Sequence, residues 1–341
     1  MVKRYSLLFI SGCLPLLTTA QIQHSAVVVE SQTDSIFRQY DLDEIVVTGT
    51  RTPKFLKDTP IQTRVITSAD IAKIDATNVQ DLLQQELPGV EFSYSMNQRT
   101  HLNFSGFGGQ SILFLVDGER LAGETMDDVD FTRLMMDNVE RIEIVKGAAS
   151  ALYGSSASGG VINIITKKAS KPWTLNLNGR LAKHGEQRYG GTFGLNSKHW
   201  SNMLSANYNT TDNYSVNSGA NPVTRVISTI YGNKTINTRE QLTWKPSTAL
   251  SFTGRAGYFF RETTRTIGQP ERYRDFSGGL RMNWTMSAFD QLRVNYSFDQ
   301  YDKSNYQTVR RLDIRSYSNV QNTVRALYSH EFERGDVLTL G

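Results

Sequence analysis

The sequence predicts an α+β domain followed by antiparallel, membrane-spanning β-strands. Up to about residue 170, strand-like runs alternate with short helix-like segments. From Trp173 onward, apolar and polar residues alternate with a period of two along segments of roughly ten residues. Beyond the N-terminus no run approaches the ~18 apolar residues of a membrane helix, so any membrane role of these residues would use strands.

The amino-acid composition is compatible with this fold class but does not by itself indicate it. The 341 residues carry a formal net charge of +4 and include 39% hydrophobic residues. No block of like charge resembles a nucleic-acid-binding arm, so we expect no nucleic-acid partner. The 15 tyrosines and 16 phenylalanines suit a chain rich in β-strands with one apolar surface.

Residues 1–20 are predicted to form a secretory signal peptide. Lys3 and Arg4 provide a positive start, an apolar core follows, and small residues lead up to Ala20, after which we expect cleavage. A lipoprotein signal that would acylate Cys13 is the alternative. With the signal peptide removed, residues 21–341 contain no cysteine, so packing and hydrogen bonds must stabilise the exported chain.

A short β-prone segment, residues 43–49, follows a polar and unpatterned stretch, residues 21–42, that we expect to be a flexible periplasmic segment. No β-prone run next to it in the sequence is available as a partner. We therefore interpret it as a strand offered to a partner's sheet edge, where backbone hydrogen bonds supply affinity. An ordinary edge strand of the next domain is the alternative. The core of the segment is Glu44, Ile45, Val46, Val47 and Thr48.

Residues 55–170 are predicted to form the compact α+β domain. A strand over residues 61–66 leads to a helix capped by Thr67 or Ser68, and a second helix is capped by Thr77 or Asn78. The second helix stops at the Leu-Pro-Gly sequence of residues 87–89, and β structure resumes after it.

Residues 93–103 are polar, and we expect a surface loop there. Its candidate ligand contacts are Asn97, Gln98, Arg99 and His101, because an exposed imidazole can meet a ligand. Gly106 and Gly108 then impose close turns before a buried strand over residues 112–116, and Asp117-Gly118 turns a hairpin. The acidic run of residues 127–130 lacks the glycine and glutamate of a calcium loop, so we expect a solvated loop.

The domain closes with two strands between Asn138 and Lys168. Residues 141–146 alternate as a half-buried strand does, and residues 148–153 have the composition of about one helical turn. Residues 161–166 form a nearly continuous apolar run, typical of a strand buried on both faces. We interpret the glycines of this region, Gly147, Gly154, Gly159 and Gly160, as positions of tight packing with no catalytic role. Together with Gly106 and Gly108, whose role is in close turns, they are the structural glycines of the domain.

From Trp173 the two-residue alternation recurs to the end of the sequence. Its polar face carries arginines and asparagines, which are too polar for the core of a soluble sandwich. We expect tight connections at residues 245–248, 287–290 and 333–336, and long ones at residues 211–235, 262–272 and 302–314. Short turns on one rim and long loops on the other are typical of an outer-membrane β-barrel. A soluble β-sandwich or propeller is the alternative, but it requires an apolar inner face.

The sequence contains no credible active site. Residues 154–159 lack the Gly-x-Ser-x-Gly register of a nucleophile elbow, and the other glycines match no nucleotide-binding loop. The five histidines show no spacing typical of a metal site. We therefore expect neither an enzyme nor a bound cofactor or metal.

Residues 43–168 resemble TonB-dependent outer-membrane receptors. Residues 44–48 resemble a TonB box, and residues 60–168 resemble the plug domain of this family, with its motifs in family order. Two residues depart from the family pattern: Ser105 stands where arginine is usual, and Ala148 stands where proline is usual. These departures affect the expected local contacts within the plug and not the resemblance to the family. The motifs are Leu87-Pro88-Gly89-Val90, Gly106-Phe107-Gly108, Leu115-Val116-Asp117-Gly118, Val139 to Gly147, Ser150 to Gly154 and Gly159 to Thr166.

The resemblance implies energised import across the outer membrane of a Gram-negative bacterium. A scarce nutrient complex would bind outer loops and the plug, and TonB would pair with Glu44–Thr48 and open the plug. Haem or a ferric siderophore ranks first as cargo, since His101 resembles the outward histidine of haem receptors, and cobalamin ranks second. The same resemblance also admits a signalling receptor, or a surface binding protein without energised transport.

Family membership would also set an expected size for the barrel. Receptors of this family have about 22 strands, whereas residues 173–341 supply eight or nine. We therefore expect this chain to be an N-terminal fragment of a longer receptor or a truncated product.

Overall fold

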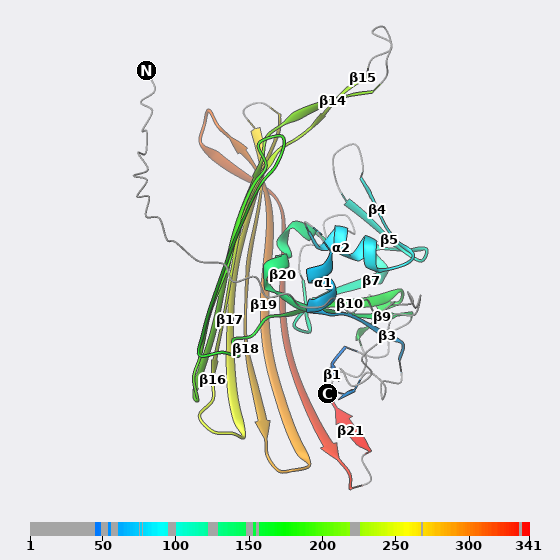
Figure 1. Ribbon diagram of the computed structural model, residues 1–341, viewed down its shortest axis with the longest axis vertical. Coiled ribbons are helices and arrows are strands. Elements are labelled where there is room, and N and C mark those ends of the chain that lie inside the picture. The colour runs from blue at the N-terminus through cyan, green and yellow to red at the C-terminus, as the bar shows by residue number, and fades with distance from the viewer. Residues whose placement is uncertain are drawn as a thin grey trace, which may run out of the picture. The chain divides into compact units, whose positions relative to one another are not determined.

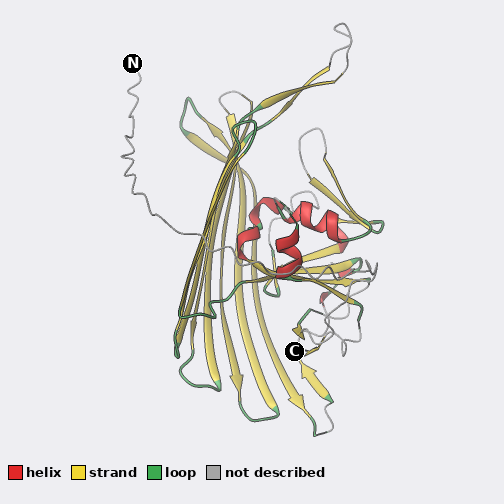
Figure 2. Ribbon diagram, viewed as in Figure 1, coloured by secondary structure: helices red, strands yellow, loops and turns green. Residues whose placement is uncertain are grey.

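The computed structural model shows an α+β domain followed by a long antiparallel sheet (Figure 1). All residues that it describes belong to one compact unit, residues 42–341. Figure 2 shows the helices in the first domain only, among the parts of the chain that are drawn as helix, strand or loop. The described residues are 45–48, 54–55, 61–74, 76, 78–94, 100–121, 129–147, 153–154, 157–218, 226–266, 269–333 and 336–341.

A five-stranded sheet in the order β3-β9-β10-β7-β8 organises the first domain. Central strand β10 runs parallel to β7 and antiparallel to β9. Every residue of β7 and β10 is buried, as the continuous apolar runs of these strands predict. The strands are β3 (Thr63–Ile66), β7 (Ile112–Val116), β8 (Glu119–Arg120), β9 (Val139–Lys146) and β10 (Gly160–Thr166).

Two capped helices cover this sheet. Thr67 caps α1 (Ser68–Lys73) in a capping box with Asp70, and Asn78 caps α2 (Val79–Glu86), so both predicted caps are confirmed. The apolar face of α2 joins the main core cluster with residues of β7, β9 and β10. The described residues also include the 3₁₀ turns η2 (Gly109–Ser111), η3 (Phe131–Arg133) and η4 (Met136–Asn138).

A second, three-stranded sheet lies in the region expected to be a loop. It consists of β4 (Val90–Tyr94), β5 (Thr100–Phe104) and β6 (Phe107–Gly108). The expected loop over residues 93–103 is therefore wrong in part, because residues 100–103 belong to β5 and pair with β4. Their polar side chains hid the strand, since only Leu102 and Phe104 of β5 are buried apolar residues.

The second part of the chain is a nine-stranded antiparallel sheet in the order β11-β12-β13-β16-β17-β18-β19-β20-β21. Figure 1 shows β16 to β20 as long neighbouring strands of this sheet. A separate hairpin, β14 with β15, continues from the end of β13. The bounds are β11 (Trp173–Leu181), β12 (Gln187–Asn196), β13 (Trp200–Thr211), β14 (Tyr214–Ser218), β15 (Val226–Ile230), β16 (Asn233–Trp244), β17 (Leu250–Thr266), β18 (Gln269–Thr285), β19 (Asp290–Gln307), β20 (Leu312–Glu331) and β21 (Val337–Leu340).

Strands β17 to β20 are 17, 17, 18 and 20 residues long, so the expected length of roughly ten residues is wrong for them. The expected long loops over residues 262–272 and 302–314 are wrong for the same reason, because the strands continue through most of both ranges. Polar side chains occupy both faces of these extensions. The alternation that marks a half-apolar strand is therefore lost there, and the sequence resembles a loop.

The nine-stranded sheet has an apolar outer face and a polar inner face. Its most exposed apolar side chains include Leu177 at 77%, Val324 at 75% and Trp173 at 68% exposure. Its buried polar side chains include Ser205, Thr235 and Asn295. This distribution is the reverse of a soluble sandwich and is typical of strands that face lipid outward, so the predicted fold class is confirmed.

Aromatic side chains form a row next to the short connections of this sheet. The Trp200 and Trp244 rings stack with centroids 5.8 Å apart, and the Trp244 and Phe252 rings stack at 5.7 Å. Exposed aromatic rows of this kind occur where barrel strands cross the membrane interface. No described helix has the length and apolar character to cross a membrane.

Candidate functional site

The β-prone segment 45–48 lies against the sheet of the first domain. Ile45–Val46 (β1) pairs antiparallel with Lys54–Phe55 (β2). Val46 and Thr48 are both 0% exposed. The expectation that no neighbour in the sequence pairs with this segment is therefore wrong, because a two-residue strand is too short to show any alternation. Glu44 lies outside the described residues.

Glu143 of β9 binds the end of this segment. Its Oε2 atom accepts hydrogen bonds from the backbone N–H groups of Val47 (2.9 Å) and Thr48 (2.8 Å) and from the Thr48 hydroxyl (2.6 Å). Its Oε1 atom accepts from Arg141 Nε at 3.0 Å and pairs with Arg141 Nη2 at 2.8 Å. A fully buried carboxylate with five such contacts is strongly held, because charged hydrogen bonds are the strong ones.

The alternation of residues 141–146 predicts that Glu143 faces water, and this is wrong. The side chain is 0% exposed, because residues 47–48 cover it. Sequence reasoning missed this residue, since its partners are 95 and 96 positions away. One feature of the sequence could have indicated a buried Glu143: it is an acidic residue between two apolar residues, Ile142 and Ile144, in the middle of a strand.

Two further side chains hold Thr48. Asn163 Nδ2 donates to the Thr48 hydroxyl at 2.9 Å, and the Tyr153 hydroxyl donates to the Thr48 carbonyl at 2.9 Å. Asn163 lies on β10 at 1% exposure. Three residues of the domain, Glu143, Tyr153 and Asn163, therefore define the docking site of segment 45–48.

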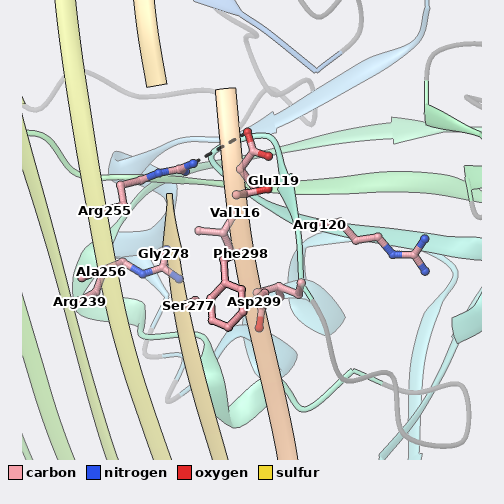
Figure 3. A pocket seen from close by; sticks show the side chains of 12 residues that line it. Val116, Glu119, Arg120, Arg239, Arg255, Ala256, Ser277, Gly278, Phe298 and Asp299 are labelled. Atoms are coloured by element: carbon pink, nitrogen blue, oxygen red, sulfur yellow. Dashed lines mark ion pairs between the residues drawn. The ribbon is translucent and has the colours of Figure 1, made fainter. Parts of the chain in front are cut away.

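The nine-stranded sheet, called the wall from here on, contacts the turn between β7 and β8. Arg281 Nη2 of β18 donates to the Asp117 carbonyl at 2.8 Å and pairs with Glu119 Oε1 at 3.3 Å. Arg255 of β17 lies 3.9 Å from the same Glu119 oxygen (Figure 3). Two wall arginines therefore converge on one carboxylate of the first domain.

Asp117 is itself held in its charged form. The surrounding protein desolvates its carboxyl group, which favours a higher pKa, but the charge of Arg255 and hydrogen bonds from Thr166 outweigh this effect. The pKa of Asp117 therefore lies below its ordinary value. Thr166 supplies its backbone N–H at 2.9 Å and its hydroxyl at 2.8 Å.

Arg133 forms a second contact between the first domain and the wall. Its guanidinium is 2% exposed and pairs with Asp275 and Asp299 of β18 and β19. Burial alone would lower the pKa of Arg133, but the two carboxylates raise it above its ordinary value. Asn237 of β16 donates to the Arg133 carbonyl at 2.6 Å, so three wall strands hold this residue.

Asp130, three residues earlier, continues this contact. Arg261 of β17 binds it through two nitrogens, at 3.1 and 3.0 Å, and the Tyr301 hydroxyl of β19 donates to it at 2.9 Å. Bidentate arginine–carboxylate pairs fix orientation as well as distance. Both the turn after β7 and residues 130–133 thus fix the first domain to the inner face of the wall.

A cavity of about 410 Å³ lies beside the docking site and the β7–β8 turn. Val47, Gly118, Asn163 and Arg281 all line it. Its volume falls in the range of small-molecule sites. A smaller cavity of about 50 Å³ lies around Glu119 and Arg255 (Figure 3).

The four candidate ligand contacts are only partly visible. His101 is exposed on β5, opposite Ser93 of β4. Asn97, Gln98 and Arg99 lie outside the described residues. No group of three or more His, Cys, Asp or Glu side chains within the described ranges could hold a metal ion.

The six glycines serve different purposes. A Cβ at Gly159 would lie 2.7 Å from the Phe107 Cβ, and one at Gly160 would lie 2.6 Å from the Val145 carbonyl oxygen, so tight packing is confirmed at these two. It is wrong for Gly147 and Gly154, where nothing lies within 4 Å and positive φ angles require glycine instead. At Gly106 the φ angle of +89° agrees with the expected close turn, whereas Gly108 has open space and no positive φ.

Comparison with known proteins identifies the first domain. The family described as "TonB-dependent Receptor Plug Domain" matches residues 56–161. The chain is 35% identical over 125 residues to the vitamin B12 transporter BtuB of Photobacterium profundum, which covers 36% of this chain and 20% of that protein. It is 38% identical over 131 residues to BtuB of Vibrio cholerae, covering 38% and 21% respectively.

Solved structures match a larger part of the chain. The siderophore receptor PiuA of Acinetobacter baumannii superposes with a TM-score of 0.65 at 15% identity, covering 83% of this chain and 44% of that one. A ferric enterobactin receptor PfeA mutant of Pseudomonas aeruginosa gives 0.65 at 19% identity, covering 87% and 50%. At these identities the likeness shows the fold.

The matched region spans about a fifth of the curated relatives and about half of the solved receptors. The relatives are described as transporters and receptors, which agrees with the expectation that the chain is not an enzyme. Residues 56–161 therefore form a plug domain of the TonB-dependent receptor family, and the antiparallel wall that follows it shares its fold with the strands of solved receptors of this kind.

Proposed function

We propose that the protein imports a scarce nutrient complex across the outer membrane of a Gram-negative bacterium, with energy supplied through TonB. One observation carries this proposal. Segment 45–48 is held on the plug by hydrogen bonds to its backbone and to one hydroxyl group. A short strand held in this way can be released and paired with another protein's sheet edge, because backbone pairing tolerates many side chains.

The wall supports a role in the membrane. Its outer face exposes large apolar side chains, and its inner face binds the plug through charged groups. Outer-membrane lipid would therefore cover the outer face, while the plug fills the space inside the barrel.

Deletion of residues 44–48 in the full-length protein tests the import mechanism. We expect the deletion to abolish uptake of radiolabelled cargo and to leave cargo binding at the cell surface unchanged. As a matched control, five residues deleted from the polar stretch 21–42 should leave uptake intact. Uptake that survives loss of residues 44–48 would contradict import energised through this segment.

For the cargo, we propose an iron complex, haem or a ferric siderophore, with cobalamin second. His101 supports this order, since its ring lies exposed on the β4–β5 hairpin of the plug. The likeness to the B12 transporters extends over 125 to 131 residues and about a fifth of those proteins, so we do not take it to favour cobalamin. Growth of a disrupted strain on haem, siderophore or cobalamin as sole source distinguishes the three.

If haem is the cargo, we expect His101→Ala to weaken haem binding by roughly tenfold or more, because an imidazole ligand to iron is lost. The measurement is a haem titration of the purified full-length receptor by absorbance. His199→Ala, on the wall next to a short connection, is the control and should leave binding unchanged. Equal affinity of the His101 variant and the original protein would remove His101 from the site.

A further inference from the structure

The turn between β7 and β8 lies between the wall and the docking site of segment 45–48. Asp117 and Gly118 have φ angles of 53° and 83°, which define a two-residue hairpin turn with both central residues in the left-handed region. On one side of the turn, Arg281 of the wall donates to the Asp117 carbonyl. The position of this carbonyl is therefore tied to β18.

On its other side, the same turn contacts Asn163. The Gly118 N–H donates to Asn163 Oδ1 at 3.0 Å, and Asn163 Nδ2 donates to the Thr48 hydroxyl at 2.9 Å. Asn163 is 1% exposed, so both ends of its amide are held by protein groups. The two neighbours together fix the orientation of the amide, because its oxygen only accepts and its nitrogen only donates.

We propose that Asn163 is a positioning residue that couples the docking of segment 45–48 to the state of the wall, through the Asp117–Gly118 turn and Arg281. This inference rests on the proposed function, since it concerns release of the segment that TonB would bind. A shift of the turn takes the donor away from the Asn163 oxygen. A buried acceptor without a partner is costly, so the amide reorients and Thr48 loses its donor.

The large cavity leaves room for this movement. Arg281, Gly118, Asn163 and Val47 all line it, so each member of the series of contacts borders open space. Cargo bound at the outer loops acts on the turn through β18, which carries Arg281. The docked and released states then differ in their contacts with the wall, which is what coupling between two sites requires.

The experiment measures segment mobility in the full-length protein, reconstituted in lipid vesicles without cargo or TonB. A nitroxide attached at Val47→Cys reports on the segment, and the cavity provides room for the label. We expect Asn163→Leu to raise the mobile fraction about fivefold and Arg281→Gln about two- to threefold, since an ordinary buried hydrogen bond contributes on the order of a fivefold change in an equilibrium. Arg281→Lys, which keeps a donor, should restore most of the immobile fraction.

Arg293→Gln is the matched control. Arg293 lines the same cavity, but its Nε donates to Asn283 of the neighbouring wall strand. We expect this variant to match the unsubstituted protein. The double variant Asn163→Leu with Arg281→Gln should equal Asn163→Leu alone, because both changes interrupt one series of contacts.

Two results would overturn the proposal: equal mobility in the Arg281→Gln and Arg293→Gln proteins, or additive effects in the double variant. If Asn163→Leu does not fold, Thr48→Val removes the same contact from the other side, together with the hydroxyl's bond to Glu143, and should raise mobility by more than fivefold. The readout needs neither cargo nor TonB. The mobility test can therefore fail while loss of residues 44–48 still abolishes uptake. Conversely, a failed uptake test does not change the mobility result.

Discussion

Glu143→Gln is the sharpest test of how the plug retains segment 45–48. One oxygen of Glu143 accepts three hydrogen bonds from Val47 and Thr48, and the other binds Arg141. Glutamine keeps the shape but has no charge, and its NH₂ group must face either Arg141 or the segment. We therefore expect docking to weaken while the fold of the plug is retained.

The size of the effect follows from these contacts. A hydrogen bond to a charged group contributes about 1.5–3 kcal/mol, and a neutral one about 0.5–1.5 kcal/mol, so each of three bonds loses on the order of 1 kcal/mol. The sum, about 2–3 kcal/mol, corresponds to a change of roughly 30- to 150-fold in the docking equilibrium. Since only the released segment can pair with TonB, the apparent dissociation constant should fall in proportion until release is complete.

The assay is binding of the purified C-terminal domain of TonB to the full-length receptor in detergent without cargo, followed by calorimetry. Glu140→Gln is the matched control, because this glutamate lies on the same strand and pairs with Arg141 but not with the segment. We expect tighter binding in the Glu143 variant only. Equal affinities in the two variants, with unchanged melting temperatures, would refute the role assigned to Glu143.

Three other changes test the plug and its attachment to the wall. Arg133→Met leaves two buried wall carboxylates without a counter-charge and should cost about 3–5 kcal/mol, measured as a lower unfolding midpoint of the plug. The pKa of Asp117 is lowered on folding, so its charged carboxylate contributes to plug stability above its ordinary pKa of 3.8, and this contribution is lost as the pH falls through the folded value. Hydrogen exchange of the plug, measured along an acid titration, should show this loss of stability. The Asp117→Asn variant should not show it. Gly160→Ala places a Cβ 2.6 Å from the Val145 carbonyl at a φ of +148° and should cost about 1–3 kcal/mol in thermal unfolding, whereas Gly108→Ala should be neutral.

Local patterns in the sequence predicted most of the plug correctly. The apolar runs of β7 and β10 indicated strands buried on both faces, and the structure buries every residue of both. Thr67 and Asn78 indicated the helix starts, because a cap depends on residues only three positions away. Such signals require no knowledge of the tertiary fold.

The candidate site depended on contacts that no local pattern reveals. Thr48 meets Glu143 across 95 positions, and Arg133 meets Asp275 across 142. Each of these residues alone resembles an ordinary surface residue, since burial of a charge becomes acceptable only once its partner is in place. The alternation of β9 therefore indicated an exposed Glu143, and only the fold shows it buried.

Polar extensions of the wall strands were predicted to be loops, although the structure shows them as strands. The wall strands continue through residues 302–307 and 312–314 with charged groups on both faces, such as Asp302, Lys303 and Asp313. Lys303 pairs with Glu271 at 3.1 Å across neighbouring strands. Backbone hydrogen bonds to neighbouring strands maintain these extensions, so they need no apolar face and have no periodic signal.

The two kinds of contact in the plug predict the order in which its parts respond to a pulling force. Segment 45–48 is held mainly by hydrogen bonds that end on Thr48 and Val47, whereas Arg133 and Asp130 are held by buried charge pairs with the wall. Breaking a buried pair leaves a charge without a partner and costs about 3–5 kcal/mol, while a hydrogen bond of the segment contributes about 1–3 kcal/mol. These contacts at Thr48 and Val47 can be lost one at a time, because each ends on a separate backbone or hydroxyl group. A force applied there therefore releases the segment first and reaches the wall contacts only through the sheet of the plug.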